Sequence, residues 1–291
     1  MKKTSLIILI LAISLGGFFA FQKEKPGDLQ QPEYRILQKW DLPEELNEIS
    51  GIDWIGENTI AAIQDEDGII FIYDLKTSSI KNKIEFNGGG DYEGIRVSKN
   101  DAYILRSNGT IFKVANYLQP NPKVTQFNSD LVEVKGIDLE GLYLDNENAR
   151  LLLAEKDRKG RNNSKGIYAV TLNLENSWKE PALKINLEDP VLQMGKKKSR
   201  GKFYPSEITA NPKNNNYYLL DAQSPSLLIM EPGGELEKLY LLDKNEFEQP
   251  EGITFDPSGA MYISNEAGSN PANITSIERS FIKDMWDSME E

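Results

Sequence analysis

One short phrase occurs five times along this chain of 291 residues, and it constrains the fold more than any other feature. Each copy places a glutamate close to the start of an apolar segment that is rich in isoleucine, leucine and glycine. The five glutamates are Glu48, Glu93, Glu140, Glu207 and Glu251. The copies recur at intervals of about 45 residues, apart from one longer interval, and this repeat length is typical of β-propeller blades.

Each repeat contains several short runs that alternate or are apolar, separated by turn residues, which predicts β-strands. In the first repeat such runs cover residues 60–64, 68–75 and 80–86, after the segment that begins at Glu48. The fifth repeat lacks a fourth run, whereas the run 34–40 precedes the first repeat and has no repeat of its own. We expect run 34–40 to complete the last blade, because closing the ring removes exposed strand edges.

The predicted fold is therefore all-β: a five-bladed β-propeller of four-stranded blades over residues 33–278, closed by an N-terminal strand. Before it, Lys2 and Lys3 precede a mostly apolar run, so residues 1–22 are predicted to be a signal anchor or signal peptide. Residues 23–32 would form a linker. The tail 279–291 has apolar residues at helical spacing, which favours a short amphipathic helix.

The N-terminal segment also predicts where the protein is found. Its apolar run reaches the lower length limit of a membrane helix and lacks a clear small-residue cleavage site, so we favour an uncleaved anchor in the inner membrane. With Lys2 and Lys3 held inside, the propeller would face the periplasm or another extracytoplasmic side. Cleavage would instead release a secreted protein.

Composition excludes several classes of function. The formal net charge is −12, which is opposite to the balance of a nucleic-acid-binding protein. The chain has no cysteine and no histidine, so disulfides, thiolate or imidazole metal sites and Ser-His-Asp catalysis are all excluded. Any metal site must consist of oxygen ligands.

The repeated glutamates are the candidate metal ligands. Each lies where the chain enters the innermost strand of a blade, so the five-fold repeat would gather Glu48, Glu93, Glu140, Glu207 and Glu251 around one channel. Such carboxylates repel one another unless a cation, a proton or hydrogen-bond donors compensate. Calcium suits them because it takes six to eight oxygen ligands in flexible geometry, although magnesium or manganese would use the same donors. Alternatively, the glutamates only accept backbone hydrogen bonds and hold neighbouring blades together.

The second strands should return to the same face of the propeller and bring further oxygen ligands. Their polar ends form a predicted outer tier, which consists of Asp65, Glu155, Asp221, Asn265 and Glu266.

A basic insertion explains the long interval between the third and fourth copies. Its positive residues are Lys196, Lys197, Lys198, Arg200 and Lys202. Because this connection leads to an inner strand, it should overhang the glutamate face and could clamp an anionic group. The alternative is a solvated, flexible loop.

Three phrases carry a family resemblance: Asp-Leu-Glu-Gly-Leu at 138–142, Gln-Pro-Glu-Gly-Ile at 249–253 and Tyr-Ile-Ser-Asn-Glu at 262–266. Together with similar short phrases between residues 34 and 277, they resemble the SdiA-regulated family of five-bladed β-propellers, which is distantly similar to NHL-repeat propellers. The resemblance implies an N-terminal membrane segment and bound calcium. Wider relatives of the gluconolactonase type include metal-dependent hydrolases.

Two functions are consistent with these residues. The first is a monomeric, calcium-binding module that is anchored in the membrane and binds a protein, a glycan or a small anionic ligand. The alternative is a calcium-dependent hydrolase of phosphate or other esters or lactones, with a carboxylate such as Glu140 or Glu251 as the base.

Overall fold

The computed structural model describes residues 34–160, 163–193 and 201–278. The segments predicted as a membrane anchor, a linker and a C-terminal helix lie outside these residues, as does most of the basic insertion. Within the described ranges, no helix is long and apolar enough to cross a membrane.

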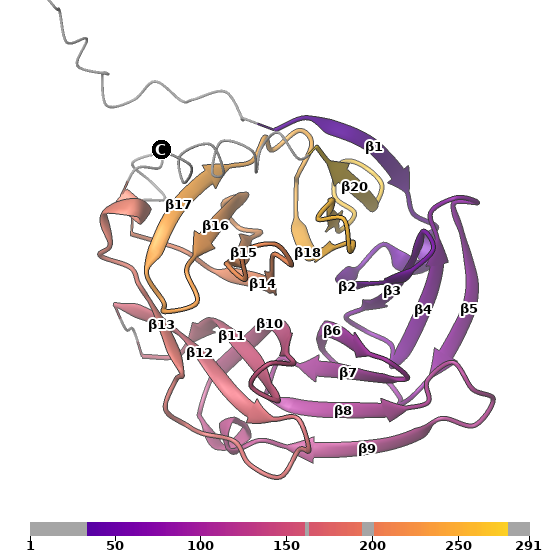
Figure 1. Ribbon diagram of the computed structural model, residues 1–291, viewed down its shortest axis with the longest axis horizontal. Coiled ribbons are helices and arrows are strands. Elements are labelled where there is room, and N and C mark those ends of the chain that lie inside the picture. The colour runs from indigo at the N-terminus through magenta and orange to yellow at the C-terminus, as the bar shows by residue number, and fades with distance from the viewer. Residues whose placement is uncertain (1–33, 161–162, 194–200, 279–291) are drawn as a thin grey trace, which may run out of the picture. The chain divides into compact units, whose positions relative to one another are not determined.

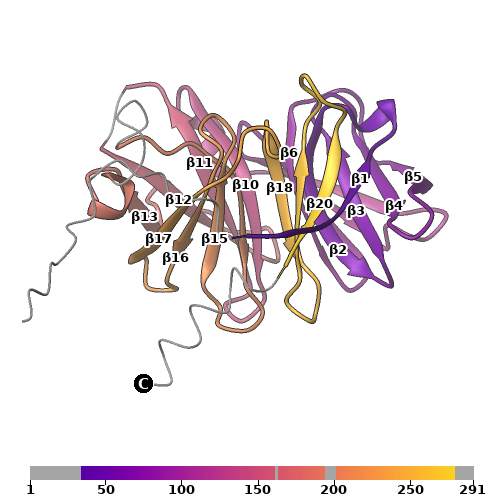
Figure 2. The ribbon, with the colours of Figure 1, turned by 90° about the horizontal axis from the view of Figure 1, so that it is seen from above.

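The described residues contain twenty strands in five antiparallel sheets of four, arranged as blades around one axis (Figures 1 and 2). Blade 1 contains β2 Ile49–Gly56, β3 Thr59–Gln64, β4 Ile69–Asp74 and β5 Ser79–Glu85. Blade 2 contains β6 Tyr92–Ser98, β7 Asp101–Arg106, β8 Thr110–Ala115 and β9 Lys123–Asn128. Blade 3 contains β10 Ile137–Asp145, β11 Arg150–Arg158, β12 Ser164–Thr171 and β13 Leu183–Asn186. Blade 4 contains β14 Pro205–Ala210, β15 Tyr217–Asp221, β16 Ser226–Met230 and β17 Leu236–Leu241.

Blade 5 combines both ends of the described chain, which confirms the predicted closure. Its inner strands β18 Pro250–Phe255, β19 Met261–Asn265 and β20 Asn273–Ile277 are followed by the N-terminal strand β1 Ile36–Asp41 (Figure 1). Strand β1 pairs antiparallel with β20, and this pairing leaves the ring without a missing outer strand.

Hydrophobic side chains fill the space between blades. Five core clusters are present in the described residues, and each is shared by two adjacent blades. Between blades 1 and 2, for example, Ile63 and Ile70 pack with Ile95 and Phe112. Successive residues of a strand point to opposite faces, so every blade contributes to two clusters.

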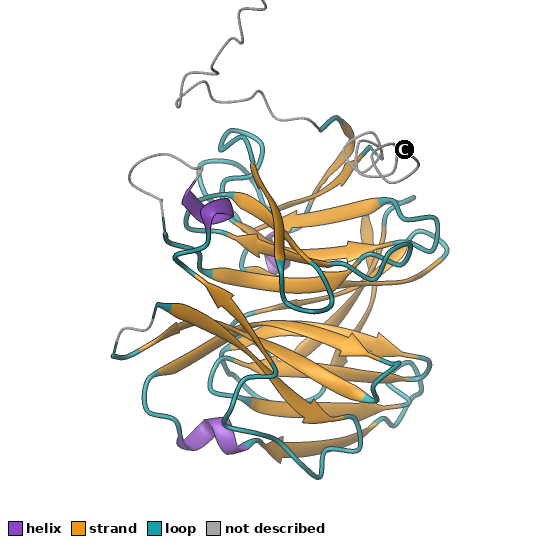
Figure 3. Cartoon of the chain, turned by 60° about the vertical axis from the view of Figure 1, so that its left-hand side comes forward, coloured by secondary structure: helices purple, strands orange, loops and turns teal. Residues whose placement is uncertain are grey.

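Within the described part of the chain, three short 3-10 helices lie in connections that precede inner strands (Figure 3). They are η1 Glu44–Leu46, η2 Asp130–Glu133 and η3 Pro190–Gln193. Each buries one leucine, namely Leu46, Leu131 and Leu192. These leucines fix the segments that lead into β2, β10 and β14, which line the channel.

Candidate functional site

The first two strands of every blade share one irregularity, a β-bulge on the inner strand. In blade 1 the pairing jumps from Ile49 to Gly51, and the other blades shift at the equivalent place. The extra residue, which we call the bulge position, is Ser50, Glu93, Glu140, Ser206 and Glu251 in blades 1 to 5. A bulge re-aims its side chain. Three of the five predicted glutamates therefore share one structural position.

The other two glutamates occupy different positions. Glu48 lies two residues before the bulge position of blade 1, and Glu207 lies one residue after that of blade 4. In the remaining blades, the residue at the position of Glu207 is a glycine that lies against the next inner strand. A Cβ atom added to Gly141, for example, would be 2.9 Å from the backbone nitrogen of Ile208. The side chain of Glu207 thus has a different environment from those of the other four glutamates.

Glu207 is a buried brace inside the channel. Its side chain is fully buried, and its Oε1 accepts hydrogen bonds from the backbone N–H groups of Leu142 at 2.7 Å and Ile208 at 2.9 Å. Its Oε2 lies 3.2 Å from Nη2 of Arg96. Burial raises the pKa of Glu207 to about 8, and Arg96 opposes that rise. Glu207 links blades 2, 3 and 4.

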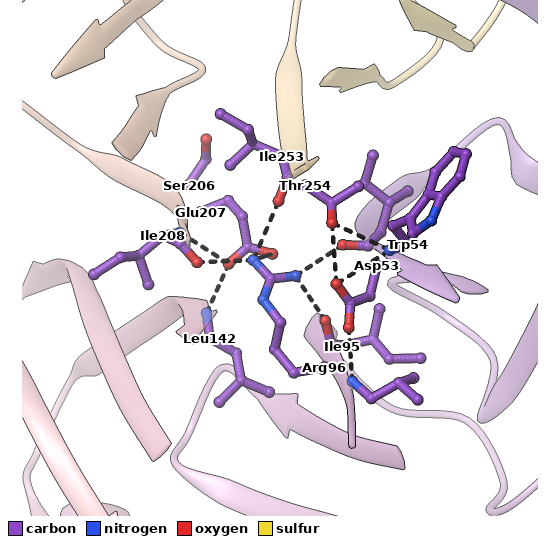
Figure 4. Close-up of polar contacts among 12 residues, drawn as sticks. Asp53, Trp54, Ile95, Arg96, Leu142, Ser206, Glu207, Ile208, Ile253 and Thr254 are labelled. Carbon is purple, nitrogen blue, oxygen red and sulfur yellow. Dashed lines mark hydrogen bonds and ion pairs between the residues drawn. The ribbon is translucent and has the colours of Figure 1, made fainter. Parts of the chain in front are cut away.

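Arg96 fills the centre of the channel at this level (Figure 4). The side chain is almost completely buried, and it donates hydrogen bonds to carbonyl oxygens from four blades. The acceptors are Ile52 at 2.8 Å, Ile95 at 2.7 Å, Ile208 at 2.7 Å and Ile253 at 3.3 Å. Together with Glu207 we call this arrangement the channel plug.

Asp53 lies beside the plug and connects blades 1, 2 and 5. Its carboxylate accepts hydrogen bonds from the backbone N–H of Val97 at 2.7 Å and from the hydroxyl of Thr254 at 3.0 Å (Figure 4). The plug and Asp53 therefore connect the inner strands through many polar contacts, although Nε of Arg96 and Oε2 of Glu207 are buried without a hydrogen-bond partner among the described residues.

A cavity of about 270 Å³ forms the acidic mouth of the channel. Eight carboxylates line it, and Lys156 is the one cationic residue among its described lining residues. The carboxylates are those of Glu48, Asp65, Asp91, Glu93, Asp138, Glu140, Glu251 and Glu266. The structure thus brings four of the five predicted glutamates together, while Glu207 is absent from the lining.

Burial and mutual repulsion raise the pKa values of the mouth carboxylates. Burial, followed by the charges of Glu140 and Asp91, raises the pKa of Glu93 far above its ordinary value. Burial and the Glu140 charge have the same effect on the pKa of Glu251. At the rim, burial and Glu48 raise the pKa of Glu266 to about 7 and that of Asp65 to about 6. The mouth is therefore short of positive charge.

Lys156 provides part of that charge through an ion pair with Oε1 of Glu140. Burial raises the pKa of Glu140 to about 7, although Lys156 acts in the opposite direction. Burial lowers the pKa of Lys156, but Glu140 and Glu251 outweigh burial and raise it above its ordinary value. Oε2 of Glu140 is buried and has no hydrogen-bond partner among the described residues.

The predicted outer tier separates into two groups because of strand register. Asp65 and Glu266 lie one residue beyond the paired end of the second strand, and both line the mouth. Glu155, Asp221 and Asn265 lie directly opposite inner-strand residues, and none of these three lines the mouth. Side chains one residue apart on a strand face opposite sides.

The second group has local hydrogen-bonding partners within the blades. Glu155 accepts a hydrogen bond from the hydroxyl of Tyr168 at 2.7 Å. Asp221 accepts from the backbone N–H groups of Tyr204 at 3.1 Å and Ser224 at 2.9 Å, and burial raises its pKa to about 6. The side-chain amide of Asn265 donates to Asn273 at 3.0 Å.

Sequence reasoning missed three charged lining residues: Asp91, Asp138 and Lys156. The two aspartates lie two residues before Glu93 and Glu140, as Glu48 lies two residues before Ser50. This i−2 spacing was a usable signal. Lys156 follows Glu155 directly, and only the strand register reveals that it faces the channel.

Most of the basic insertion, including Lys196, Lys197, Lys198 and Arg200, lies outside the described residues. Lys202 is described and is exposed to solvent. The anion clamp at these five residues stays a prediction.

The chemistry of the mouth fits a hard cation, because its acidic side chains offer only oxygen atoms as metal ligands. In addition, two buried oxygens, Oε2 of Glu140 and Oδ1 of Asp65, have no hydrogen-bond partner among the described residues. The present arrangement is not a finished ligand set: no group of three or more acidic side chains in the described ranges is placed so that it could hold a metal ion. Binding of a metal ion would require these side chains to reorient, and Glu140 would have to exchange its ion pair with Lys156 for contact with the metal.

Comparison with known proteins identifies a family match and structural neighbours. The family model described as SdiA-regulated matches residues 28–270. No curated protein matches the chain.

Among solved structures, the glutaminyl cyclase of Myxococcus xanthus has a TM-score of 0.56 and 12% identity, with 84% of this chain and 95% of the cyclase covered. The PQQ-bound aldose sugar dehydrogenase of Streptomyces coelicolor has a TM-score of 0.53 and 11% identity, with 85% and 98% covered. Streptogramin B lyase has a TM-score of 0.43 and 18% identity, and the match covers 80% of this chain but 66% of the lyase, just under two thirds of its length. At these identities the similarity concerns the fold alone.

Proposed function

We propose that this chain, which belongs to the SdiA-regulated family, is a binding module whose acidic mouth binds calcium. Calcium would hold the loops at the mouth in one arrangement, and these loops would contact a protein, a glycan or a small anionic ligand. Residues 1–22 would anchor the module in the inner membrane, with the propeller on the extracytoplasmic side.

The observation that carries this proposal is the charge imbalance of the mouth. Eight carboxylates surround about 270 Å³ with Lys156 as their one cationic neighbour in the lining. Crowding like charges in a partly dry cavity is unfavourable, as the raised pKa values of Glu93, Glu140 and Glu251 indicate. A divalent cation would relieve that repulsion.

Among divalent cations, calcium suits the mouth best. It takes six to eight oxygens at variable geometry, whereas magnesium demands a near-ideal octahedron and keeps several waters. The mouth offers many carboxylates on separate blades and no nitrogen or sulfur ligand from histidine or cysteine. Binding at this position would link blades 1, 2, 3 and 5.

Thermal unfolding of the full-length protein in detergent tests the proposal. After treatment with a chelator, calcium at about 100 times its Kd should raise Tm by roughly 5 °C or more, because a ligand of the folded state stabilises it by mass action. The same Tm measurement with magnesium or manganese at equal concentration tests whether the mouth is selective for calcium. Isothermal titration calorimetry then measures the Kd directly.

The double variant Glu140→Gln with Glu251→Gln should abolish the calcium shift, since glutamine keeps size and hydrogen bonding but removes charge. The matched control is Glu85→Gln with Glu231→Gln, two exposed glutamates outside the mouth, which should respond like the unmodified protein. An unchanged calcium response in the mouth variant would instead make these glutamates structural and refute the proposed site.

The hydrolase is the second candidate, and one observation favours it. Glu140 and Glu266 have pKa values of about 7, which is the range a general base needs at neutral pH. Bound calcium would supply Lewis-acid chemistry to an ester or lactone. Turnover of phosphate and carboxylic esters that requires calcium and disappears in Glu140→Gln would favour the hydrolase over the binding module.

A further inference from the structure

Lys156 stands out because the fold of blade 3 is modified to place it in the mouth. In the other blades the pairing of the first two strands ends near the bulge position, but in blade 3 it continues to Ile137 opposite Arg158. This extension contains a second register shift, between Asp138 and Leu139, whose partners are Asp157 and Glu155. Lys156 is the unpaired residue between those partners.

Glu140 and Lys156 are therefore bulge residues on two adjacent strands. Bulges re-aim single side chains, and they occur preferentially next to functional sites. Here the two bulged side chains meet each other in an ion pair inside the mouth. The residues that follow the paired strand end in blades 1, 2, 4 and 5 are Asp65, Ser107, Ala222 and Glu266, none of which is basic.

The ion pair with Lys156 engages only one of the two oxygens of the buried Glu140 carboxylate. Glu140 is 5% exposed, and while its Oε1 accepts from Lys156, its Oε2 has no partner within the described chain. Lys156 offers one positive charge to a cavity with eight carboxylates. A divalent cation could contact several of these oxygens at once, but a cation at Glu140 and the Lys156 ammonium would occupy the same space and repel each other.

We propose that Lys156 is a built-in competitor for the cation of the mouth, a tethered ammonium that occupies Glu140 until a divalent cation displaces it. This inference rests on the proposed calcium site and adds how the affinity of that site is set. The ammonium protects the mouth from self-repulsion when calcium is scarce, and its displacement weakens calcium binding. The device favours divalent over monovalent cations, since a monovalent ion brings no more charge than the ammonium that it replaces.

Calcium titration of the full-length protein by calorimetry tests the inference, with Lys156→Met as the principal variant. Methionine keeps the length of an apolar stem and removes the charge, so the Kd for calcium should fall about ten-fold, in line with the strength of a partly buried charged hydrogen bond. The matched control is Lys113→Met, which breaks the 2.9 Å ion pair with Asp101 on blade 2, outside the mouth, and should leave the Kd unchanged.

Labelling of lysines in the unmodified protein provides a second measurement that needs no variant. The rate at which an amine-reactive reagent modifies Lys156, followed by mass spectrometry with and without calcium, should rise several-fold when calcium displaces the ammonium. Lys113 provides the internal reference.

The outcomes separate this inference from the calcium site itself. If the unmodified protein binds calcium but Lys156→Met binds it equally or more weakly, and labelling does not rise, Lys156 is no competitor and the calcium site stands. Calcium binding by Lys156→Met alone would support the inference. If neither protein binds calcium, the proposed site fails and the inference fails with it.

Discussion

The glutamate of the plug and the glutamates of the mouth share one channel, but their partners differ, and Glu207 is fully buried whereas Glu93 and Glu251 are partly exposed. At the plug, Glu207 has a guanidinium and two backbone N–H groups for its two oxygens. At the mouth, Glu93, Glu140 and Glu251 crowd against other carboxylates, and Lys156 is the cation among them. A carboxylate with its own donors stabilises the ring, whereas a carboxylate without them is available for a ligand.

A shift of one residue along the inner strand produces this difference. Ser206 occupies the bulge position in blade 4, so the glutamate of that repeat falls on the next residue and faces the plug. Ser206 instead donates its hydroxyl to the carbonyl of Pro250 in blade 5 at 2.8 Å. Similar sequence phrases thus give a buried brace in blade 4 and cavity-lining carboxylates in the four other blades.

The largest expected effect comes from breaking the plug. Arg96→Met should lower the free energy of unfolding by about 3–5 kcal/mol, because it leaves Glu207 buried without its cation and removes donors to four blades. Urea unfolding followed by tryptophan fluorescence measures the change.

The matched variant at the mouth is Glu251→Gln, which should leave stability in chelator unchanged or raise it, because it removes one repelling charge. Equal losses in Arg96→Met and Glu251→Gln would contradict the distinction between plug and mouth, since both glutamates would then be braces.

An intermediate effect is expected from pH. Asp65, Glu140 and Glu266 have pKa values in the folded protein of about 6, 7 and 7, above those of unfolded chains, so the folded state binds extra protons. Their contribution to stability is complete below about pH 4 and is lost as pH rises through these folded values. Without calcium, the free energy of unfolding should fall by about 1–2 kcal/mol between pH 5 and 8, after allowance for solvent screening.

Calcium separates the two regions in the same experiment. It should remove the pH-dependent loss that belongs to the mouth, while the loss that belongs to Glu207, which builds up from about pH 4.5 and levels off near pH 8, should persist. The measurement is a set of urea unfolding curves in chelator and in calcium. Curves whose pH dependence is identical in both conditions would show that the mouth carboxylates do not exchange protons for calcium.

The fold could be predicted from the sequence because repeat length, strand patterning and the unpaired run 34–40 all point to one closed ring. Apolar residues alternate along each strand and the strands recur at the length of a blade, and both periods can be read from a single sequence. The closure of β1 on β20 followed from the missing strand of the fifth repeat.

The candidate site was only partly predictable, because it depends on strand register. Aligning the repeats on their glutamates treats Glu207 as equivalent to Glu140, but the bulge position of blade 4 belongs to Ser206. Side-chain direction changes with every residue, so an error of one residue moves a carboxylate from the mouth to the plug. Lys156 depends on a second bulge in blade 3, and nothing in its local sequence marks that bulge.

The smallest expected effect concerns the two blades whose bulge position holds a serine. Ser50 and Ser206 donate hydrogen bonds to the carbonyls of Tyr92 at 2.6 Å and Pro250 at 2.8 Å, so each joins its blade to the next. Replacing either serine with alanine should lower the free energy of unfolding by about 1 kcal/mol, because the buried carbonyl loses its donor.

The response of these two serine variants to calcium tests the difference between mouth and plug further, because Ser50 lines the mouth and Ser206 does not. If only carboxylates bind the cation, Ser50→Ala and Ser206→Ala should both keep the calcium-induced rise in Tm, measured by differential scanning calorimetry. Loss of that rise in Ser50→Ala alone would make its hydroxyl a ligand and extend the binding role of the bulge position to blade 1. Loss in both variants would instead show that the contact between neighbouring blades, rather than the charge of the mouth, controls cation binding.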